Sequence, residues 1–210
     1  MLLFSFLLLP LVLLLYCLLA KEKRNLIIIF IGILSSSLLC AIKEFVLFSH
    51  RLVPYSFGLN FVYFFPQTLV VTIVVYGLFI LLTKDEWDFK IKSFFPLILS
   101  FYSIYLPYLI LSSSSSNYSA YFIFIKPLNY LAMFVICYFY LKKFYKNLLE
   151  KKVPLSIFSI TIFLVSLIFP AIVESLYVIN SSLAIVLILS FLFILFSIFL
   201  VYTNKFLKKE

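Results

Sequence analysis

Seven stretches of about twenty almost continuously apolar residues are the feature that most constrains how this chain can fold. Each stretch is long enough to cross a hydrocarbon core about 30 Å thick as one helix. In lipid the backbone must pair internally, which leaves helices or closed barrels, and barrel strands alternate apolar and polar residues. The stretches show no such alternation, so they predict an all-α fold, a polytopic helical membrane protein with seven transmembrane helices. They comprise residues 2–20, 26–48, 61–82, 93–111, 121–141, 155–179 and 183–203.

Composition supports lipid as the main surroundings of the whole chain. Apolar residues make up 65% of the sequence and charged residues 12%, whereas about 25% are charged in soluble domains. Residues 2–20 lack a preceding basic region and a small-residue cleavage site before Lys21, so we expect a retained first span instead of a signal peptide. The connections are too short for a second domain. Residues 1–210 are therefore expected to form a single integral membrane domain.

The distribution of basic residues predicts the orientation of the spans. Fourteen of the 17 Lys and Arg residues follow the first, third, fifth or seventh apolar stretch. Because short basic loops stay in the cytoplasm, the amino terminus is expected outside and the carboxyl terminus in the cytoplasm. The net charge of +9 is thus explained by topology and contact with anionic lipids, and no nucleic-acid partner is expected. The Phe-, Ile- and Lys-rich composition favours a bacterial cytoplasmic (inner) membrane.

Polar residues within the apolar stretches form a candidate functional layer. A charged side chain at membrane depth costs about 2.5–3.5 kcal/mol, so each one calls for an explanation. In the predicted topology these residues map to the outer half of the bilayer, next to Pro66, Pro127 and Pro170. They are interpreted either as an outward-facing cavity that binds a solute or as a neutralised pair among kinked helices. The candidates are Glu174, Lys126, Lys43, Glu44, Gln67 and Asn129.

Two contacts are expected from positions along the spans. Glu174 and Lys126 each lie about five residues, or roughly 7–8 Å, inside the outer boundary. Glu174 is therefore expected to pair with Lys126, with Lys43 as the alternative partner. In the second span, Ser37 and Ala41 form a small-x-x-x-small face that predicts a close helix contact.

Several chemistries are disfavoured by what the sequence lacks. Cys17, Cys40 and Cys137 have no partners at metal-ligand spacing and are expected to be free thiols. The single histidine, His50, has no companion ligands for zinc. No glycine-rich phosphate loop or activated nucleophile is visible, so no catalytic residue, metal site or cofactor is expected. We recognise no family in these motifs.

The favoured function is binding or transport of a small solute through the outer-half polar layer. The alternative is a non-catalytic assembly or sensory subunit that contacts another membrane protein. An enzyme acting on lipid ranks last, because no catalytic constellation is present. Besides the lipid bilayer, the expected partners are therefore a small solute or another membrane protein.

Overall fold

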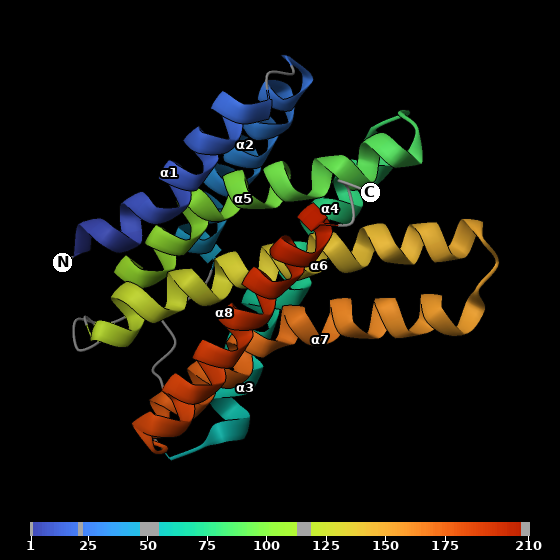
Figure 1. Ribbon diagram of the computed structural model, residues 1–210. Coiled ribbons are helices and arrows are strands. Elements are labelled where there is room, and N and C mark those ends of the chain that lie inside the picture. Colours follow the sequence, from blue (N-terminus) through green and yellow to red (C-terminus); the bar gives the residue numbers. More distant parts are fainter. Residues whose placement is uncertain (1, 21–22, 47–54, 113–118, 207–210) are drawn as a thin grey trace. The chain divides into compact units, whose positions relative to one another are not determined.

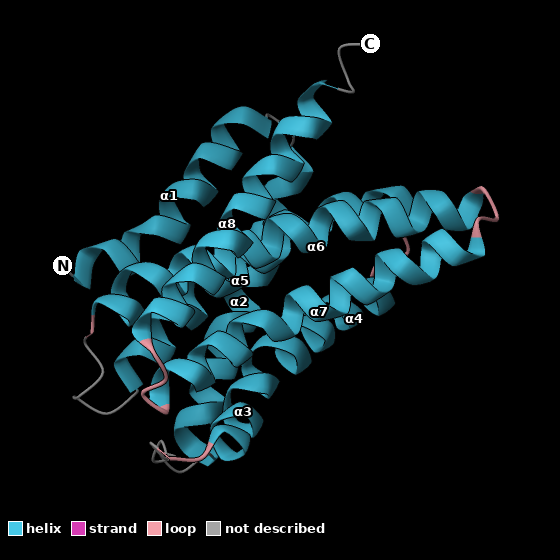
Figure 2. Ribbon diagram, turned by 60° about the horizontal axis from the view of Figure 1, so that its bottom comes forward, coloured by secondary structure: helices cyan, strands magenta, loops and turns pink. Residues whose placement is uncertain are grey.

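The computed structural model describes residues 2–20, 23–46, 55–112 and 119–206. These residues contain helices and no strands (Figures 1 and 2), which confirms the expected all-helical fold. The elements are α1 (Leu2–Ala20), α2 (Lys23–Val46), α3 (Phe57–Phe65), the π-helix η1 (Pro66–Val70), α4 (Val71–Leu82), α5 (Trp87–Ser112), the π-helix η3 (Tyr121–Ile125), α6 (Lys126–Leu149), α7 (Val153–Val178) and α8 (Leu183–Phe206).

Six helical segments in the described part of the chain are long and apolar enough to cross a membrane. α1 contains a shorter apolar stretch, Phe6–Leu18, and its role as the first of seven spans stays a prediction. The six segments are Arg24–Glu44, Phe57–Leu82, Trp87–Leu111, Tyr121–Leu149, Val153–Val178 and Leu183–Asn204. Lipid is the solvent that suits such helices, because their polar backbone groups are paired within each helix.

The chain divides into two compact units, each assembled from two separate segments. Unit 1 comprises Met1–Arg51 and Val75–Pro127, and unit 2 comprises Leu52–Val74 and Leu128–Glu210. The single membrane domain expected from the short connections stays a prediction. The six candidate residues are divided between the units, so each unit is described by itself.

In unit 1, α5 is the central helix and packs against both α1 and α2. Phe94, Ile98 and Phe101 on α5 are fully buried. Gly32 on α2 lies at a close contact with α5. A Cβ atom at Gly32 would lie 2.0 Å from Ser100 Oγ and 2.6 Å from the Leu97 carbonyl oxygen. The hydrogen side chain therefore allows the two helix backbones to touch, which is how small residues act in membrane helix pairs.

The close-packed face of α2 differs from the expected one. Ser37 and Ala41 are exposed, whereas Gly32 and Ser36 are buried. The small-x-x-x-small pair on the buried face of α2 is therefore Gly32 and Ser36, and Ser36 directly precedes Ser37. The prediction of a Ser37–Ala41 packing face was wrong, because all sides of this helix are apolar and periodicity does not distinguish the lipid side from the protein side.

In unit 2, α7 packs against α3, η1 and α8. The rings of Phe169 on α7 and Phe193 on α8 stack with centroids 4.0 Å apart. α6 also contacts α7, because the Cys137 thiol donates a hydrogen bond to the Phe163 carbonyl oxygen at 3.7 Å. All three cysteines of the chain are free thiols in the structure. These contacts make α7 the helix that joins the other elements of unit 2.

Both π-helices of the described residues lie beside a proline. η1 begins at Pro66. The Val71 amide donates a hydrogen bond to the Pro66 carbonyl oxygen, five residues earlier. η3 ends just before Lys126, whose amide donates to the Tyr121 carbonyl, and Pro127 follows. A proline inside a helix removes one donor and crowds the preceding turn, so a widened turn relieves the clash. Short π-helical turns of this kind occur frequently at functional sites.

The two helical hairpins of unit 2 close with the same turn chemistry. After α6, Lys152 N donates to Asn147 O and Lys151 N donates to Leu148 O, with Lys151 at φ 56°. After α7, the corresponding donors are the amides of Ser181 and Asn180, with Asn180 at φ 54°. Both are Schellman motifs, in which one left-handed residue ends the helix. The hairpin expected between residues 155–179 and 183–203 is thus present.

We expect Lys151→Gly to stabilise the protein by about 1 kcal/mol, because a β-carbon is disfavoured at a left-handed position. Lys151→Ala removes the same charge but keeps the β-carbon, and it serves as the matched control. Thermal unfolding of the purified protein measures both. Equal midpoints for the Gly and Ala variants would contradict the turn assignment.

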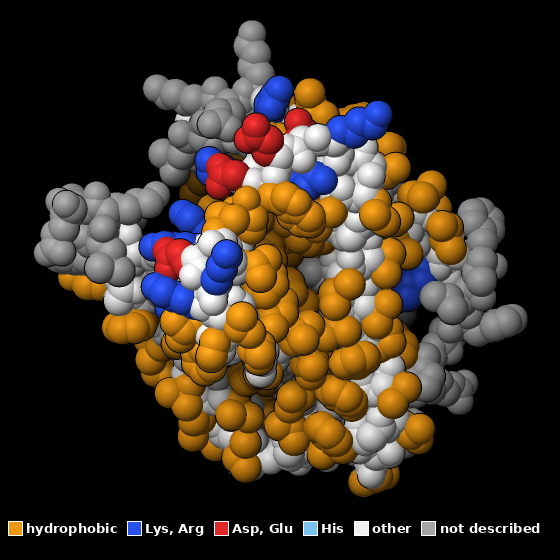
Figure 3. Space-filling view, turned by 90° about the vertical axis from the view of Figure 1, so that its right-hand side faces the viewer, with side chains coloured by type: hydrophobic (Ala, Val, Ile, Leu, Met, Phe, Trp, Pro, Cys, Tyr) orange, Lys and Arg blue, Asp and Glu red, His pale blue; other side chains and the backbone are white. Residues whose placement is uncertain are grey.

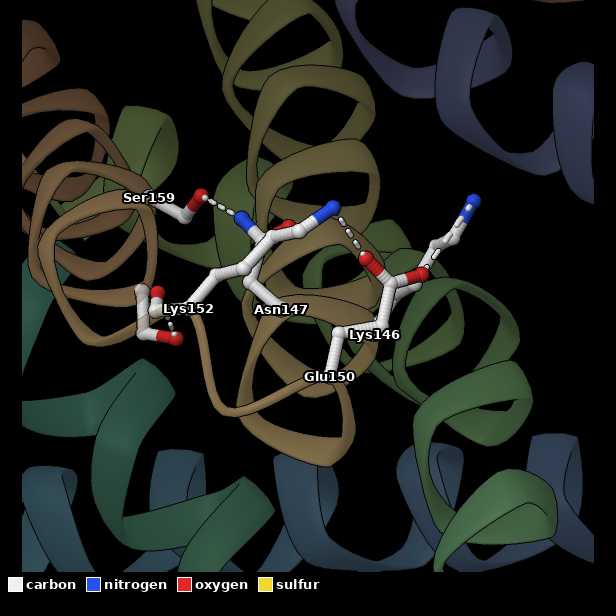
Figure 4. A network of polar contacts seen from close by, with 6 residues as sticks. Lys146, Asn147, Glu150, Lys152 and Ser159 are labelled. Atoms are coloured by element: carbon white, nitrogen blue, oxygen red, sulfur yellow. Dashed lines mark hydrogen bonds and ion pairs between the residues drawn. The ribbon is translucent and has the colours of Figure 1, made fainter.

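Charged side chains gather in patches while apolar side chains cover most of the face drawn in Figure 3. One network closes the α6–α7 hairpin (Figure 4). Glu150 Oε2 lies 2.7 Å from Lys152 Nζ, and Glu150 Oε1 lies 3.8 Å from Lys146 Nζ. Nearby, Asn147 Nδ2 donates to Ser159 Oγ at 3.4 Å, which joins α6 to α7. In the predicted topology this hairpin lies in the cytoplasm.

The hydrogen bond and charge of Lys152 lower the pKa of the Glu150 carboxyl below its ordinary range. A lowered carboxyl pKa in the folded state stabilises the protein above the unfolded-state pKa, and this contribution disappears as the pH falls through the folded-state value. We therefore expect a slight loss of stability on acidification below the ordinary glutamate range. Glu150 is exposed to solvent, so the effect is small. Unfolding midpoints of wild type and Glu150→Gln measured against pH should converge at the acid end.

Candidate functional site

Unit 1 holds three of the six candidate residues at one end of its helices. Lys43 lies three residues before the end of α2, and Lys126 directly follows η3. Lys126 is 3% exposed and Lys43 is half-buried. The two ammonium groups are close enough to repel one another electrostatically. The fold of unit 1 therefore places these two cations, which are far apart in the sequence, within electrostatic range of each other.

Aromatic rings surround these two lysines. Lys43 Nζ lies 5.5 Å from the centre of the Tyr105 ring and 5.9 Å from that of Tyr108, both on α5. Lys126 Nζ lies 5.3 Å from the centre of the Phe122 ring in η3. A cation over a ring face is attracted by about 0.5–2 kcal/mol, which offsets part of its transfer cost without neutralising its charge.

Glu44 does not join this cluster. Its side chain is exposed, and no ion pair of Glu44 is found within the described residues. Consecutive residues of a helix point about 100° apart, so Glu44 faces away from the direction that Lys43 takes. The idea that Glu44 provides a local counter-charge for Lys43 receives no support from this geometry.

Unit 2 holds Glu174, Gln67 and Asn129. Glu174 is fully buried on α7, one turn beyond Pro170. Its charge acts on Tyr63, and the Tyr63 side chain also interacts with Gln67. The Gln67 amide nitrogen in turn donates to the Tyr63 carbonyl at 3.2 Å. Gln67 therefore contacts Tyr63, and Glu174 lies within electrostatic range of the same tyrosine.

The helix opposite Glu174 presents further polar groups on its buried face. Asn60 and Thr68 are fully buried and Gln67 is 6% exposed, and the elements that carry them, α3 and η1, both contact α7. A spacing of seven or eight residues keeps Asn60, Gln67 and Thr68 on one helix face. Together with Tyr63 and Glu174, these three residues form what we call the Glu174 cluster.

Asn60 and Thr68 were missed by the sequence reasoning. Asn60 lies just before the apolar stretch 61–82, whereas α3 begins at Phe57 with Ser56 as its N-cap. Ser56, whose hydroxyl accepts a hydrogen bond from the Leu59 amide, is a usual N-cap residue and marks the start of the helix. Extending the helix to this cap would have brought Asn60 onto the same face as Gln67.

Asn129 has a different role from the other candidates. Its amide nitrogen donates to Ser190 Oγ at 2.9 Å, so it links α6 to α8. Both side chains are buried, and the carbonyl oxygen Asn129 Oδ1 accepts no hydrogen bond from the described residues. A buried hydrogen bond of this kind fixes the contact between two helices at membrane depth.

A cavity of about 400 Å³ lies between α6 and α8. Its lining is mostly aliphatic, from Leu128 to Val135 on α6 and from Ile194 to Tyr202 on α8. None of the six candidate residues lines this cavity. This apolar space is thus distinct from the polar solute cavity expected from the sequence.

The polar groups of these sites suit the binding of polar or charged ligands. Among the described residues there is no group of three or more His, Cys, Asp or Glu side chains that could hold a metal ion, and His50 lies outside the described residues. The Glu174 cluster offers carboxylate, amide and hydroxyl groups, which bind polar or cationic groups. The lysines of unit 1 offer two positive charges among aromatic rings. Because Lys126 belongs to unit 1 and Glu174 to unit 2, their expected pairing stays a prediction.

Comparison of the chain with protein-family models gave no match, and comparisons with curated proteins and with solved structures gave none either.

Proposed function

We propose that this chain is a multi-pass protein of a bacterial cytoplasmic membrane that binds a small solute through polar groups at membrane depth. The observation that carries the proposal is the full burial of Glu174 on α7 against the polar face of α3 and η1. A carboxyl group in a transmembrane helix is costly and is a functional-site hypothesis by default. Helix clamps in membranes need only small or neutral polar residues, as at Asn129 and Ser190.

The neighbours of Glu174 support binding over a purely structural role. Pro170, one turn before Glu174, has no amide hydrogen to donate to the carbonyl oxygen of Ser166. The widened turn of η1 contacts the same helix. Discontinuous helices that expose backbone carbonyls beside acidic side chains are how many membrane transporters hold a substrate or an ion. The amides of Asn60 and Gln67 supply both donors and acceptors for a polar ligand.

Thermal unfolding of the purified full chain in lipid nanodiscs, with a panel of amino acids, sugars and inorganic ions, tests the proposal. A ligand present at 100 times its dissociation constant stabilises the folded state by about 2.7 kcal/mol. We expect at least one solute to raise the unfolding midpoint of the wild type and to lose this effect in Glu174→Gln.

The matched control is Glu86→Gln, the same change at an exposed glutamate of the α4–α5 connection. This variant should keep the solute effect of the wild type. If no solute shifts the wild type, or if Glu174→Gln responds as the wild type does, the proposed function fails.

The alternative function, a non-catalytic assembly or sensory subunit, is favoured by α8. Of its side chains described, only Val186, Ser190 and Ser197 are buried, so almost the whole helix is left for lipid or for a partner helix. A stable complex with another membrane protein after gentle solubilisation, together with no solute effect, would favour this alternative.

The proposed topology has seven spans, with the amino terminus outside and the carboxyl terminus in the cytoplasm. Reporter fusions at Asp85 and Glu150 should give cytoplasmic signals, because both lie in basic connections between helices. A fusion at Ser115 should give an exterior signal. A cytoplasmic signal at Ser115 would refute the proposed orientation.

A further inference from the structure

The apolar cavity between α6 and α8 in unit 2 has no part in the proposed function. Its walls are mostly aliphatic side chains of these two helices. The Ser197 hydroxyl, which also lines the cavity, donates a hydrogen bond to the Ile194 carbonyl oxygen of its own helix at 2.7 Å. Because this hydroxyl is already bonded and the rest of the wall is mostly hydrocarbon, the cavity favours an apolar occupant over a polar one.

This cavity is a groove that opens along α8. Ala132 on the α6 wall is buried, whereas Ile198 and Val201 on the α8 wall are exposed. The exposed apolar side chains of a membrane-spanning helix face acyl chains, which are as apolar as leucine. An acyl chain that enters the groove from the side gains contacts with both walls, and an empty groove lacks these contacts.

Two contacts between α6 and α8 limit the width of the groove. The Asn129 amide nitrogen donates to Ser190 Oγ at 2.9 Å, and the rings of Tyr140 and Phe196 stack with centroids 6.4 Å apart. A helix with its side chains is about 10–12 Å wide. These contacts therefore leave no room for a further helix between α6 and α8, whereas a single acyl chain is thin enough to enter.

Two lysines follow the groove-lining part of α6. Lys142 comes seven residues after the lining residue Val135, so it continues the same helix face about 10 Å farther along. Lys143 Nζ lies 5.7 Å from the centre of the Tyr140 ring, which packs against α8. Both lysine side chains are exposed. The end of the groove that follows Val135 is therefore positively charged.

The acidic residue of the α6–α7 hairpin is engaged with other lysines. Glu150 lies 2.7 Å from Lys152 Nζ and 3.8 Å from Lys146 Nζ. Within the described residues, Lys142 and Lys143 form no ion pair. Their two charges are thus available to an anion that reaches the end of the groove.

We propose that the α6–α8 groove binds one anionic phospholipid, with an acyl chain along the groove and the phosphate at Lys142 and Lys143. This end of α6 is cytoplasmic in the proposed topology, so the lipid belongs to the inner leaflet. Ammonium groups form strong charged hydrogen bonds with phosphate, and a lipid with net negative charge is attracted more than a zwitterionic one. The inference goes beyond the proposed solute binding, because the groove contains no residue of the Glu174 cluster.

Photocrosslinking of the full chain in phosphatidylcholine nanodiscs tests the proposal. The probes are phosphatidylglycerol and phosphatidylcholine, each added at the same low molar fraction and each carrying a diazirine on one acyl chain. Mass spectrometry locates the crosslinked residues, and titration of the probe gives its apparent affinity. Unfolding midpoints establish that each variant is folded.

One variant fills the groove and another removes its charge. Ala132→Leu fills the groove from the α6 wall, and Ala184→Leu is the matched control at an exposed alanine of α8. The double variant Lys142→Gln/Lys143→Gln removes the two cations. Its control, Lys146→Gln/Lys151→Gln, removes the same charge from the same hairpin.

We expect the phosphatidylglycerol probe to label groove residues more strongly than the phosphatidylcholine probe. Lys142→Gln/Lys143→Gln should weaken the binding of phosphatidylglycerol by about 10-fold to 30-fold, as for two lysines near a membrane surface. Ala132→Leu should abolish the groove crosslinks of both probes. Both control variants should be labelled as the wild type is.

Equal labelling by the two probes, or labelling that survives Lys142→Gln/Lys143→Gln, overturns the proposal. Absence of groove crosslinks together with a dimer that Ala132→Leu abolishes would assign the groove to a second copy of the chain and overturn it as well. If Ala132→Leu does not fold, the lysine variants decide the outcome, because their changes are at exposed positions. Glu174→Gln should leave the crosslinks unchanged, so this inference and the proposed function fail independently.

Discussion

Replacing Gly32 with alanine is expected to destabilise the protein by about 1–3 kcal/mol, the usual effect of overpacking a closely packed interior. The added Cβ would lie 2.0 Å from Ser100 Oγ and 2.6 Å from the Leu97 carbonyl oxygen. Ser100 can rotate, but the Leu97 carbonyl belongs to the backbone of α5. α2 and α5 would therefore have to separate along their contact, which is the main contact of unit 1. Reversible unfolding in mixed detergent micelles gives the free-energy difference.

The matched controls are Gly58→Ala and Gly77→Ala, because a Cβ at either position meets no atom within 4 Å. Alanine is a better helix former than glycine by about 0.5–1 kcal/mol, so these two changes should leave the protein equally or more stable. Adding Ser100→Gly to Gly32→Ala should restore only part of the loss, because the backbone clash persists. A Gly32→Ala variant that behaves like the controls would contradict the close approach of α2 and α5.

Helix positions could be predicted well from the sequence because lipid imposes a simple requirement. The first apolar stretch, 2–20, coincides with α1, and the others lie within or close to the observed helices. Helix ends were less predictable, because hydropathy follows the thickness of the bilayer and not the length of the helix. α5 begins at Trp87, six residues before the apolar stretch, where Asp88 and Lys92 form an ion pair at 2.6 Å across one turn.

The packed faces could not be predicted, and the reason is physical. In water, the polar face of a helix marks its exposed side. A transmembrane helix is apolar on its lipid side too, so the sequence pattern of α2 does not distinguish the face of Ser37 from the face of Gly32. The candidate site shares this difficulty. The sequence mapped both Lys43 and Lys126 to the outer half of the bilayer, and in unit 1 the charge of Lys126 does act on Lys43. Asn60 and Thr68 could not be identified without knowing which face of α3 and η1 is buried.

Glu174 and Lys126 are expected to stabilise the protein as a pair, and a double-mutant cycle should detect a coupling of about 3 kcal/mol or more. The expectation comes from their shared depth in the predicted spans and from the burial of each, 0% exposed for Glu174 and 3% for Lys126. Removing one member of a buried ion pair leaves an uncompensated charge, which costs about 3–5 kcal/mol. Removing both members leaves no buried charge behind.

The cycle uses Glu174→Gln, Lys126→Met and the double variant, with unfolding free energies measured in detergent. Each single change should destabilise strongly, and the double variant should be less destabilised than the sum of the two. Glu174→Gln combined with Lys84→Met provides the control, since Lys84 is an exposed lysine outside the spans, and these two effects should add. If Glu174→Gln and Lys126→Met also add, the groups do not interact, and each charge must be compensated within its own unit. That outcome would remove the support for one outer-half cavity shared by Glu174 and Lys126 and would leave the Glu174 cluster as the candidate site by itself.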